Sequence, residues 1–198
     1  VATQPTPPAD IAEPTAEESA ATPMRMGDFT MARGDATSAL TLYRRAHEAA
    51  PDEAEPLVRL GSALARVGSF EESAGAFRAA LDLDPANAEA TRGLANAEIA
   101  LNRPQNALPV LQAAIARPDA DALLYNTYGV ALDHLGRHEE AQTQYRAGLA
   151  AMPNDLDLQT NLAISLALAG RHAEAIAGMR DVATAPGANA KHRQNLAL

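Results

Sequence analysis

Few residues of this sequence could do chemistry, and their spacing does not assemble an active site. His134 and His138 lie four residues apart, as zinc-binding histidines on one helix do, but Gly136 between them is expected to end the helix. The two rings would then not share a face, and we predict no metal site. Asp133 beside His134 could exchange a proton, yet neither a nucleophile nor oxyanion donors accompany the pair, so we interpret both as surface residues. We also expect His138, like His172, to be solvated.

The motifs of common enzyme classes are missing as well. The sequence contains no nucleophile elbow of the form G-x-S-x-G, no phosphate-binding loop and no dinucleotide-binding glycine pattern. Lys191 is the only lysine, which removes Schiff-base chemistry and lysine-dependent phosphate binding. We therefore predict a protein that is not an enzyme and uses no cofactor.

Composition narrows the classes of partner. The 198 residues carry 16 basic and 25 acidic side chains, a net charge of −9, which argues against nucleic acid as a partner because nucleic acid requires a basic face. No run of eighteen apolar residues exists, so we predict no transmembrane span. The chain has no cysteine, which excludes disulfides and thiolate metal sites. Hydrophobic residues make up 47% but aromatic residues only 4%, which suits alanine-rich helix interfaces.

A period of 34 residues organises most of the chain and indicates stacked supersecondary units. Each unit has a column of small residues, a column of residues suited to a left-handed turn, and a column that is mostly aromatic. The small residues are Gly27, Gly61, Ala95, Gly129, Ala163 and Ala197; the turn residues are Gly34, Gly68, Asn102, Gly136 and Gly170; the third column is Tyr43, Phe77, Leu111, Tyr145 and Met179.

Each unit is predicted to be a helical hairpin. Apolar residues at helical spacing surround the small residue, which lets a second helix approach closely, and glycine or asparagine then reverses the chain. Pro109 falls inside the second helix of the third unit, where we expect a kink. We expect the first helix to begin near Pro23 with Thr22 as its cap. The other predicted helix caps are Ser69, Asn87, Asp121, Asp155 and Asn189.

These columns resemble the tetratricopeptide repeat. The resemblance implies an all-α fold, a right-handed α-solenoid of about five helical hairpins plus the start of a sixth. The expected repeat domain covers 20–198, with units 20–53, 54–87, 88–121, 122–155 and 156–189 and a partial unit 190–198. Residues 1–19 hold four prolines, four acidic residues and no basic residue, and we predict a flexible linker there.

The fourth and fifth units carry a narrower resemblance. Residues 126–149, 161–175 and 186–198 resemble the TadD family, the repeat lipoproteins of the tight-adherence (Flp) pilus assembly system. This resemblance implies a pilotin-like protein that binds a segment of the outer-membrane secretin and helps it to localise or assemble. It also implies a lipid anchor upstream of Val1 and a location on the periplasmic face of the bacterial outer membrane.

Two alternatives stay open. The chain could be a regulatory repeat domain excised from a larger enzyme, or a general envelope scaffold, and a cytoplasmic location also stays open. A lipid-modified cysteine upstream of Val1 would support the TadD interpretation, whereas a catalytic domain downstream would support the enzyme interpretation.

The concave side of a solenoid is the surface that such arrays use for binding, so we expect a protein or peptide partner there. Arginines mark the first half of this surface, while amides and aliphatic residues mark the second. We expect a partner with an acidic end and an amphipathic stretch, although the acidic linker around Glu13, Glu17 and Glu18 could itself occupy the arginines. The candidate groove residues are Arg25, Arg59, Arg66, Arg92, Asn96, Ile99, Asn126, Val130, His134, Asn161, Ile164 and Leu168.

Overall fold

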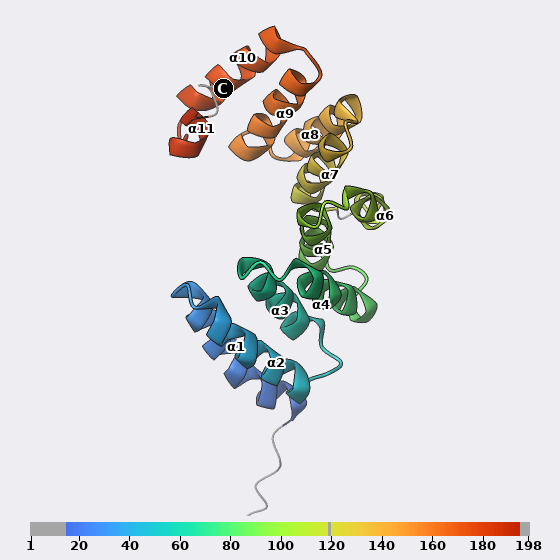
Figure 1. The fold of residues 1–198 in the computed structure, drawn as a ribbon, viewed down its shortest axis with the longest axis vertical. Helices are drawn as coiled ribbons and strands as arrows, with labels where there is room; N and C mark the ends of the chain where they lie inside the picture. The colour runs from blue at the N-terminus through green and yellow to red at the C-terminus, as the bar shows by residue number, and fades with distance from the viewer. Residues whose placement is uncertain (1–14, 119, 195–198) are drawn as a thin grey trace, which may run out of the picture.

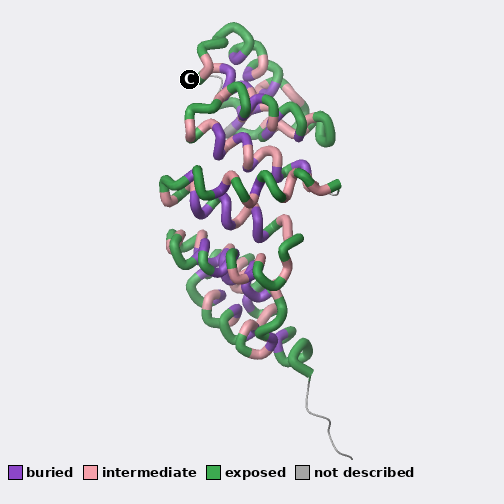
Figure 2. Tube along the Cα trace, turned by 90° about the vertical axis from the view of Figure 1, so that its right-hand side faces the viewer, coloured by how far each residue is buried: buried purple, intermediate pink, exposed green. Residues whose placement is uncertain are grey.

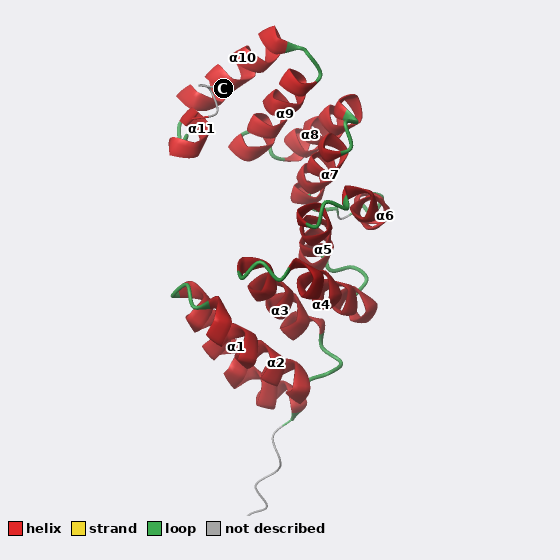
Figure 3. Ribbon diagram, in the orientation of Figure 1, coloured by secondary structure: helices red, strands yellow, loops and turns green. Residues whose placement is uncertain are grey.

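The structure, a computed structural model, describes residues 15–118 and 120–194. Within these residues the chain forms helices joined by short turns, with no β-strand (Figure 3). The helices are α1 (Ala16–Ala32), α2 (Ala36–Ala49), α3 (Ala54–Arg66), α4 (Phe70–Leu83), α5 (Ala88–Ala100), α6 (Pro104–Ile115), α7 (Ala122–His134), α8 (His138–Ala151), α9 (Leu156–Leu168), α10 (His172–Thr184) and α11 (Ala190–Gln194).

Successive helices pair into five hairpins that stack along one axis, followed by α11 (Figure 1). The second helix of each hairpin also packs on the first helix of the next, and neighbouring first helices touch, as α7 touches α9. The array bends, so that α1 and α11 lie on the same side of its middle (Figure 1). The predicted all-α solenoid of five hairpins and the start of a sixth is confirmed.

Burial follows the seams between helices rather than one central core (Figure 2). Phe77 of α4 is 2% exposed, and its ring lies against Gly61 of α3 and Gly93 of α5. A Cβ atom at either glycine would approach this ring to within 3.0 Å. The small residue Gly61 therefore lies where two helices touch, as predicted, and the ring that fills this contact is that of Phe77. Gly93 adds a second contact from the following unit.

Turns and caps follow the local sequence signals in most units. Asn102 has a φ angle of 58°, the left-handed conformation predicted for the turn column. The side chains of Asn87 and Asp155 accept hydrogen bonds from backbone N–H groups three residues further on, and the Asp121 side chain caps α7 by accepting from Leu123 N, two residues on. Ser69 stands at the N-cap of α4, as predicted, but its side chain makes no capping hydrogen bond.

The first helix begins earlier than predicted. It starts at Ala16, and Thr15 forms a capping box in which its hydroxyl accepts from Glu18 N and its backbone N–H donates to the Glu18 carboxylate. The predicted start near Pro23 is wrong, because this reciprocal cap stabilises an earlier helix start and Pro23 is accommodated inside α1. Residues 15–19 of the predicted linker therefore belong to the cap and first turn of α1, while 1–14 lie outside the described residues.

Pro109 is also accommodated within a helix. Helix α6 runs without interruption from Pro104 to Ile115, with Pro109 in its interior. The side chains of Pro109 and Gln105 are exposed, so water can satisfy the Gln105 carbonyl that lacks an intrahelical donor.

Helix α11 docks on the fifth unit through His192, which is only 6% exposed. Asn189 Oδ1 accepts from His192 N, and the His192 ring lies 3.4 Å from an Asp157 carboxylate oxygen of α9. From the sequence we also expect Leu196 to cover the fifth unit, but this residue lies outside the described residues. Such a short helix is not stable by itself, so its order depends on this docking.

We predict that deleting residues 190–198 loosens the fifth unit. Without α11, part of the apolar surface of α9 and α10 becomes exposed, and hydrogen exchange there should rise by about tenfold or more, while exchange in α3 to α6 stays unchanged. The variant His192→Ala should show the same pattern more weakly. Unchanged exchange in α10 of the truncated protein would contradict this assignment.

Candidate partner-binding groove

A hollow of about 300 Å³ opens on the surface formed by the first helices of the fourth and fifth units. Its walls come mainly from α7 and α9, which touch each other, and its floor includes a tyrosine from α8. The lining residues are Val130, Asp133, His134, Tyr145, Asn161, Ile164 and Leu168. Five of these seven are among the groove residues expected from sequence.

The repeat period explains why these side chains meet. Val130 and Ile164 occupy equivalent positions in successive units, as do His134 and Leu168, so they become neighbours when α7 packs beside α9. Asn161 Nδ2 donates to Asn126 Oδ1 over 2.9 Å, which ties the two helices together beside the hollow. Each amide keeps hydrogen-bonding capacity for a partner's backbone.

The wall of the hollow is apolar and has no covering in the structure. The exposed fractions of Ile164 and Leu168 are 38% and 57%, high values for large aliphatic side chains. Because about half of each side chain is already buried, covering the remainder with a partner would contribute on the order of 1 kcal/mol per side chain. The hollow therefore suits an apolar side chain of a bound segment.

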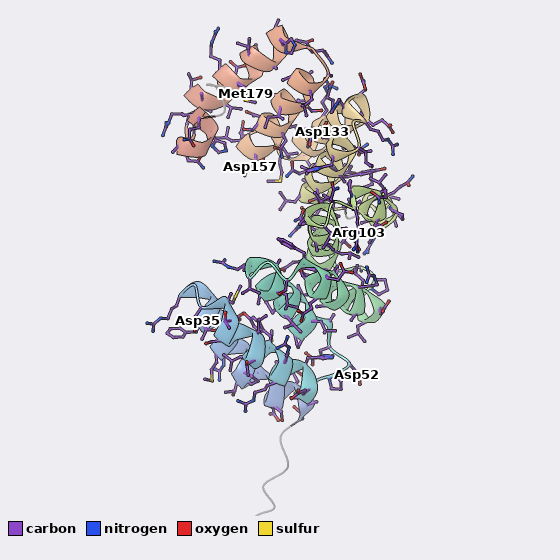
Figure 4. All side chains as sticks on the ribbon, in the orientation of Figure 1. Asp35, Asp52, Arg103, Asp133, Asp157 and Met179 are labelled. Atoms are coloured by element: carbon purple, nitrogen blue, oxygen red, sulfur yellow. The ribbon has the colours of Figure 1, made fainter. Side chains whose placement is uncertain are left out.

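Asp133 forms the polar floor of this hollow, where α7, α8 and α9 meet (Figure 4). Its Oδ1 atom accepts from Ser165 Oγ at 2.7 Å and lies 2.8 Å from His138 Nδ1, and its Oδ2 atom accepts from Tyr145 OH at 2.9 Å. The Asp133 side chain is 12% exposed and the His138 side chain 21%. These four side chains, which we call the Asp133 network, join the fourth unit to the fifth.

The network corrects two expectations. Asp133 is not a surface residue paired with its neighbour, because its side chain is only 12% exposed and its carboxylate contacts Ser165, His138 and Tyr145. His138 is not simply solvated, since it is partly buried against Asp133, whereas His172 is exposed as expected. A sequence signal for the network did exist: a buried tyrosine requires a partner for its hydroxyl, and Tyr145 stands in the aromatic column.

Tyr43 of the first unit makes the equivalent contact, since its hydroxyl donates to Asp28 Oδ1 over 2.9 Å. Burial is the main cause that raises the pKa of both buried tyrosines above its usual value, and the nearby carboxylates, Asp28 for Tyr43 and Asp133 for Tyr145, raise it further. An unfolded chain releases tyrosine protons near pH 10, whereas the folded chain retains them.

We predict that the free energy of unfolding falls as pH rises above about 10. Each tyrosine that stays protonated only in the folded state should contribute up to about 1.4 kcal/mol per pH unit to this loss. The variant Tyr145→Phe should unfold in urea with a shallower pH dependence between about pH 9.5 and 11. Identical slopes for parent and variant would contradict the assigned burial of the hydroxyl.

The arginines of the first half are less available than the sequence suggests. Arg59 Nε lies 2.8 Å from a Glu55 carboxylate oxygen and 4.0 Å from Asp28, and Arg92 forms an ion pair with Asp121. Arg66 is exposed, with no ion pair to another described residue. Arg25 is also exposed, but it lines a separate hollow on the outer face of α1.

The other two candidate groove residues of the first half, Asn96 and Ile99, also lie in different environments. Asn96 is exposed on α5, whereas Ile99 packs against the buried cluster formed by α5, α6 and α7. The twelve candidates therefore do not form one continuous site. The hollow at α7 and α9 gathers Val130, His134 and Asn161 with the two exposed aliphatic residues, and Asn126 adjoins it.

Comparison with known families agrees with the repeat architecture. The sequence profile of the tetratricopeptide repeat matches residues 25–88, 58–122 and 129–189. The chain belongs to the tetratricopeptide repeat family. In that family, a helical hairpin is the repeating unit, which accounts for the five hairpins described above.

Several solved tetratricopeptide repeat structures share this fold. MamA is 25% identical with a TM-score of 0.69, and the match covers 83% of this chain and 90% of MamA. PilW, a type IV pilus biogenesis factor, is 18% identical with a TM-score of 0.76 and coverages of 90% and 78%. PilF of Pseudomonas aeruginosa is 17% identical with a TM-score of 0.74 and coverages of 92% and 89%. The last two likenesses show the fold alone.

No curated protein matches the chain by sequence. In the described part of the chain, no helix combines the length and the apolar character that crossing a bilayer requires. Among residues 15–118 and 120–194, no group of three or more His, Asp or Glu side chains is arranged to bind a metal ion.

Proposed function

We propose that this tetratricopeptide repeat protein binds an extended peptide segment of another protein, and that one apolar side chain of that segment enters the hollow between α7 and α9. The observation that carries this proposal is the exposed aliphatic wall of Ile164 and Leu168 beside the Asn126–Asn161 amide pair. Apolar burial provides affinity, and amide groups at the rim can hold a peptide backbone in register.

The hollow contains no free charge that would select a charged side chain. Among the described residues that line it, Asp133 is the only one with a carboxylate, and its two oxygen atoms already interact with Ser165, His138 and Tyr145. A cationic side chain would have to displace these partners to reach it. An aliphatic or aromatic residue of the bound segment therefore fits the hollow better than lysine or arginine.

For the partner, we propose a segment of a secretin of a tight-adherence pilus system, with this protein as a pilotin-like lipoprotein on the periplasmic face of the outer membrane. The support is the resemblance of 126–149, 161–175 and 186–198 to the TadD family. The likeness to PilW, a type IV pilus biogenesis factor, is compatible with such a role. A regulatory domain of a larger enzyme and a general scaffold are the alternatives.

The test is a titration of a C-terminal secretin peptide from the same pilus system into the protein, measured by calorimetry. Ile164→Asp and Leu168→Asp should each weaken binding by about tenfold or more, because each places a charge in the apolar wall. Ile176→Asp is the matched control, since Ile176 is 54% exposed on α10, outside the hollow. Equal affinities for all variants would reject the groove, and tight binding of unrelated apolar peptides would favour a general scaffold.

Charge should act mainly on the association rate. Because Arg59 and Arg92 are already in ion pairs, we expect Arg66→Glu to slow association with an acidic peptide more than Arg59→Glu does. The effect should fade at high salt. Of the acidic residues proposed to compete for this surface, Glu17 and Glu18 belong to the first turn of α1, and Glu13 lies outside the described residues.

A further inference from the structure

Within residues 15–118 and 120–194, no helix packs on the outer face of α1 as one does on every later first helix. Met26 is 53% exposed and Phe29 61% exposed, and with Thr22, Arg25 and Thr30 they line a shallow hollow of about 520 Å³. In the later units, the second helix of the preceding hairpin packs on the first helix, as α2 packs on α3. The positions equivalent to Met26 and Phe29 are buried in the second and third units, with exposed fractions of 8% at Leu60, 0% at Ala63, 8% at Leu94 and 2% at Ala97.

The residues on this face do not suit the packing of another tetratricopeptide hairpin against α1. Phe29 occupies the position where the later units hold Ala63, Ala97, Ala131 and Ser165. Those small residues let the preceding helix approach closely, whereas a phenylalanine would keep it away. The face therefore needs a covering helix that offers a small residue opposite Phe29.

We propose that this face binds the same face of a second copy of the chain, with the two α1 helices antiparallel about a two-fold axis between Arg25 and Met26. A two-fold interface must be self-complementary. In this register, Thr22 of each copy lies opposite Phe29 of the other. The interface therefore contains two contacts between a small and a large side chain. The same register sets Glu18 opposite the partner's Arg33, so opposite charges meet at both ends of the helix pair.

Charged groups on this face support that register, and one of them limits the affinity of the dimer. Glu18 is exposed and uses one carboxylate oxygen in its capping box, which leaves the other free. Arg33 lies with its guanidinium 5.5 Å from the centre of the Phe29 ring, which holds it over the same face. Arg25 would lie near its own symmetry mate, and this like-charge contact would weaken the dimer. Asp28 is engaged with Tyr43 and does not take part.

A single pair of helices buries less surface than stable dimers usually do, so the association should be weak and reversible. Sedimentation of the whole chain from about 1 µM to about 1 mM should show a concentration-dependent rise in mass. Phe29→Asp should raise the dimer dissociation constant by tenfold or more, whereas Arg25→Ala should lower it. Ile176→Asp, at the far end of the array, should leave it unchanged.

Cross-linking tests the register directly, because the chain has no cysteine of its own. A mixture of Thr22→Cys and Phe29→Cys proteins should cross-link through a short bifunctional thiol reagent at least tenfold faster than either protein alone. Charge reversal provides a second check: Arg33→Glu should weaken the dimer, and adding Glu18→Arg to it should restore association, with melting curves confirming that both variants fold.

Three results would overturn the proposal. The first is a parent chain that sediments as a monomer up to about 1 mM. The second is equal cross-linking in the mixed and single-variant samples. The third is a monomeric Phe29→Cys protein whose thiol reacts with a thiol reagent only when residues 1–14 are deleted, which would make that segment, rather than a second copy, the cover of α1.

Discussion

Gly61→Val and Gly93→Val should each lower the free energy of unfolding by about 1–3 kcal/mol. Both glycines face the ring of Phe77, and a Cβ atom at either position would come within 3.0 Å of it. Phe77 is 2% exposed and packs in the cluster that joins the second unit to the third, so the ring cannot move into solvent to make room. The expected loss therefore comes from strain in a seam between units.

Gly75→Val is the matched control for this prediction. Gly75 lies inside α4, as Gly61 lies inside α3, but a Cβ atom there meets no neighbouring atom within 4 Å. Valine has a slightly better helix propensity than glycine, so this variant should change stability by less than about 0.5 kcal/mol. Urea unfolding of the three variants tests this prediction: similar losses at Gly75 and Gly61 would mean that contact with the Phe77 ring does not cause the loss.

Asp133→Ala should lower the free energy of unfolding by about 2–4 kcal/mol, the other large effect that we expect. The substitution leaves the buried Tyr145 hydroxyl without its acceptor, leaves Ser165 Oγ with only its longer bond of 3.3 Å to the His138 carbonyl, and removes the partner of the His138 ring. Ser165 belongs to α9, so the loss should also weaken the cooperativity between the fourth and fifth units.

Asp28→Ala provides the comparison, because Asp28 accepts one tyrosine hydroxyl, that of Tyr43, and its side chain is half exposed. Its loss should cost about 1 kcal/mol. A double-mutant cycle between Asp133→Ala and Tyr145→Phe measures their coupling directly. A coupling near zero, or equal costs for Asp133→Ala and Asp28→Ala, would show that the Asp133 network contributes no more than an ordinary surface hydrogen bond.

The sequence by itself determined the parts of this protein that recur with the period of 34. The left-handed turn at Asn102 and the caps at Asn87 and Asp155 depend on residues within a few positions of each other, so their chemistry can be recognised locally. The position of the small residues at helix contacts was predictable for the same reason, because they recur inside an apolar stripe at helical spacing. The hairpins and their number follow from these signals.

Only the tertiary structure decided the features that occur once. Asp133 meets Ser165 across 32 residues, Gly93 meets Phe77 from the next unit, and Arg92 pairs with Asp121 at the start of the following hairpin. None of these contacts recurs at the other units, so no column of the repeat reveals them. Their physical origin is the stacking of one unit on the next, which brings side chains together at distances that depend on helix placement and not on local sequence.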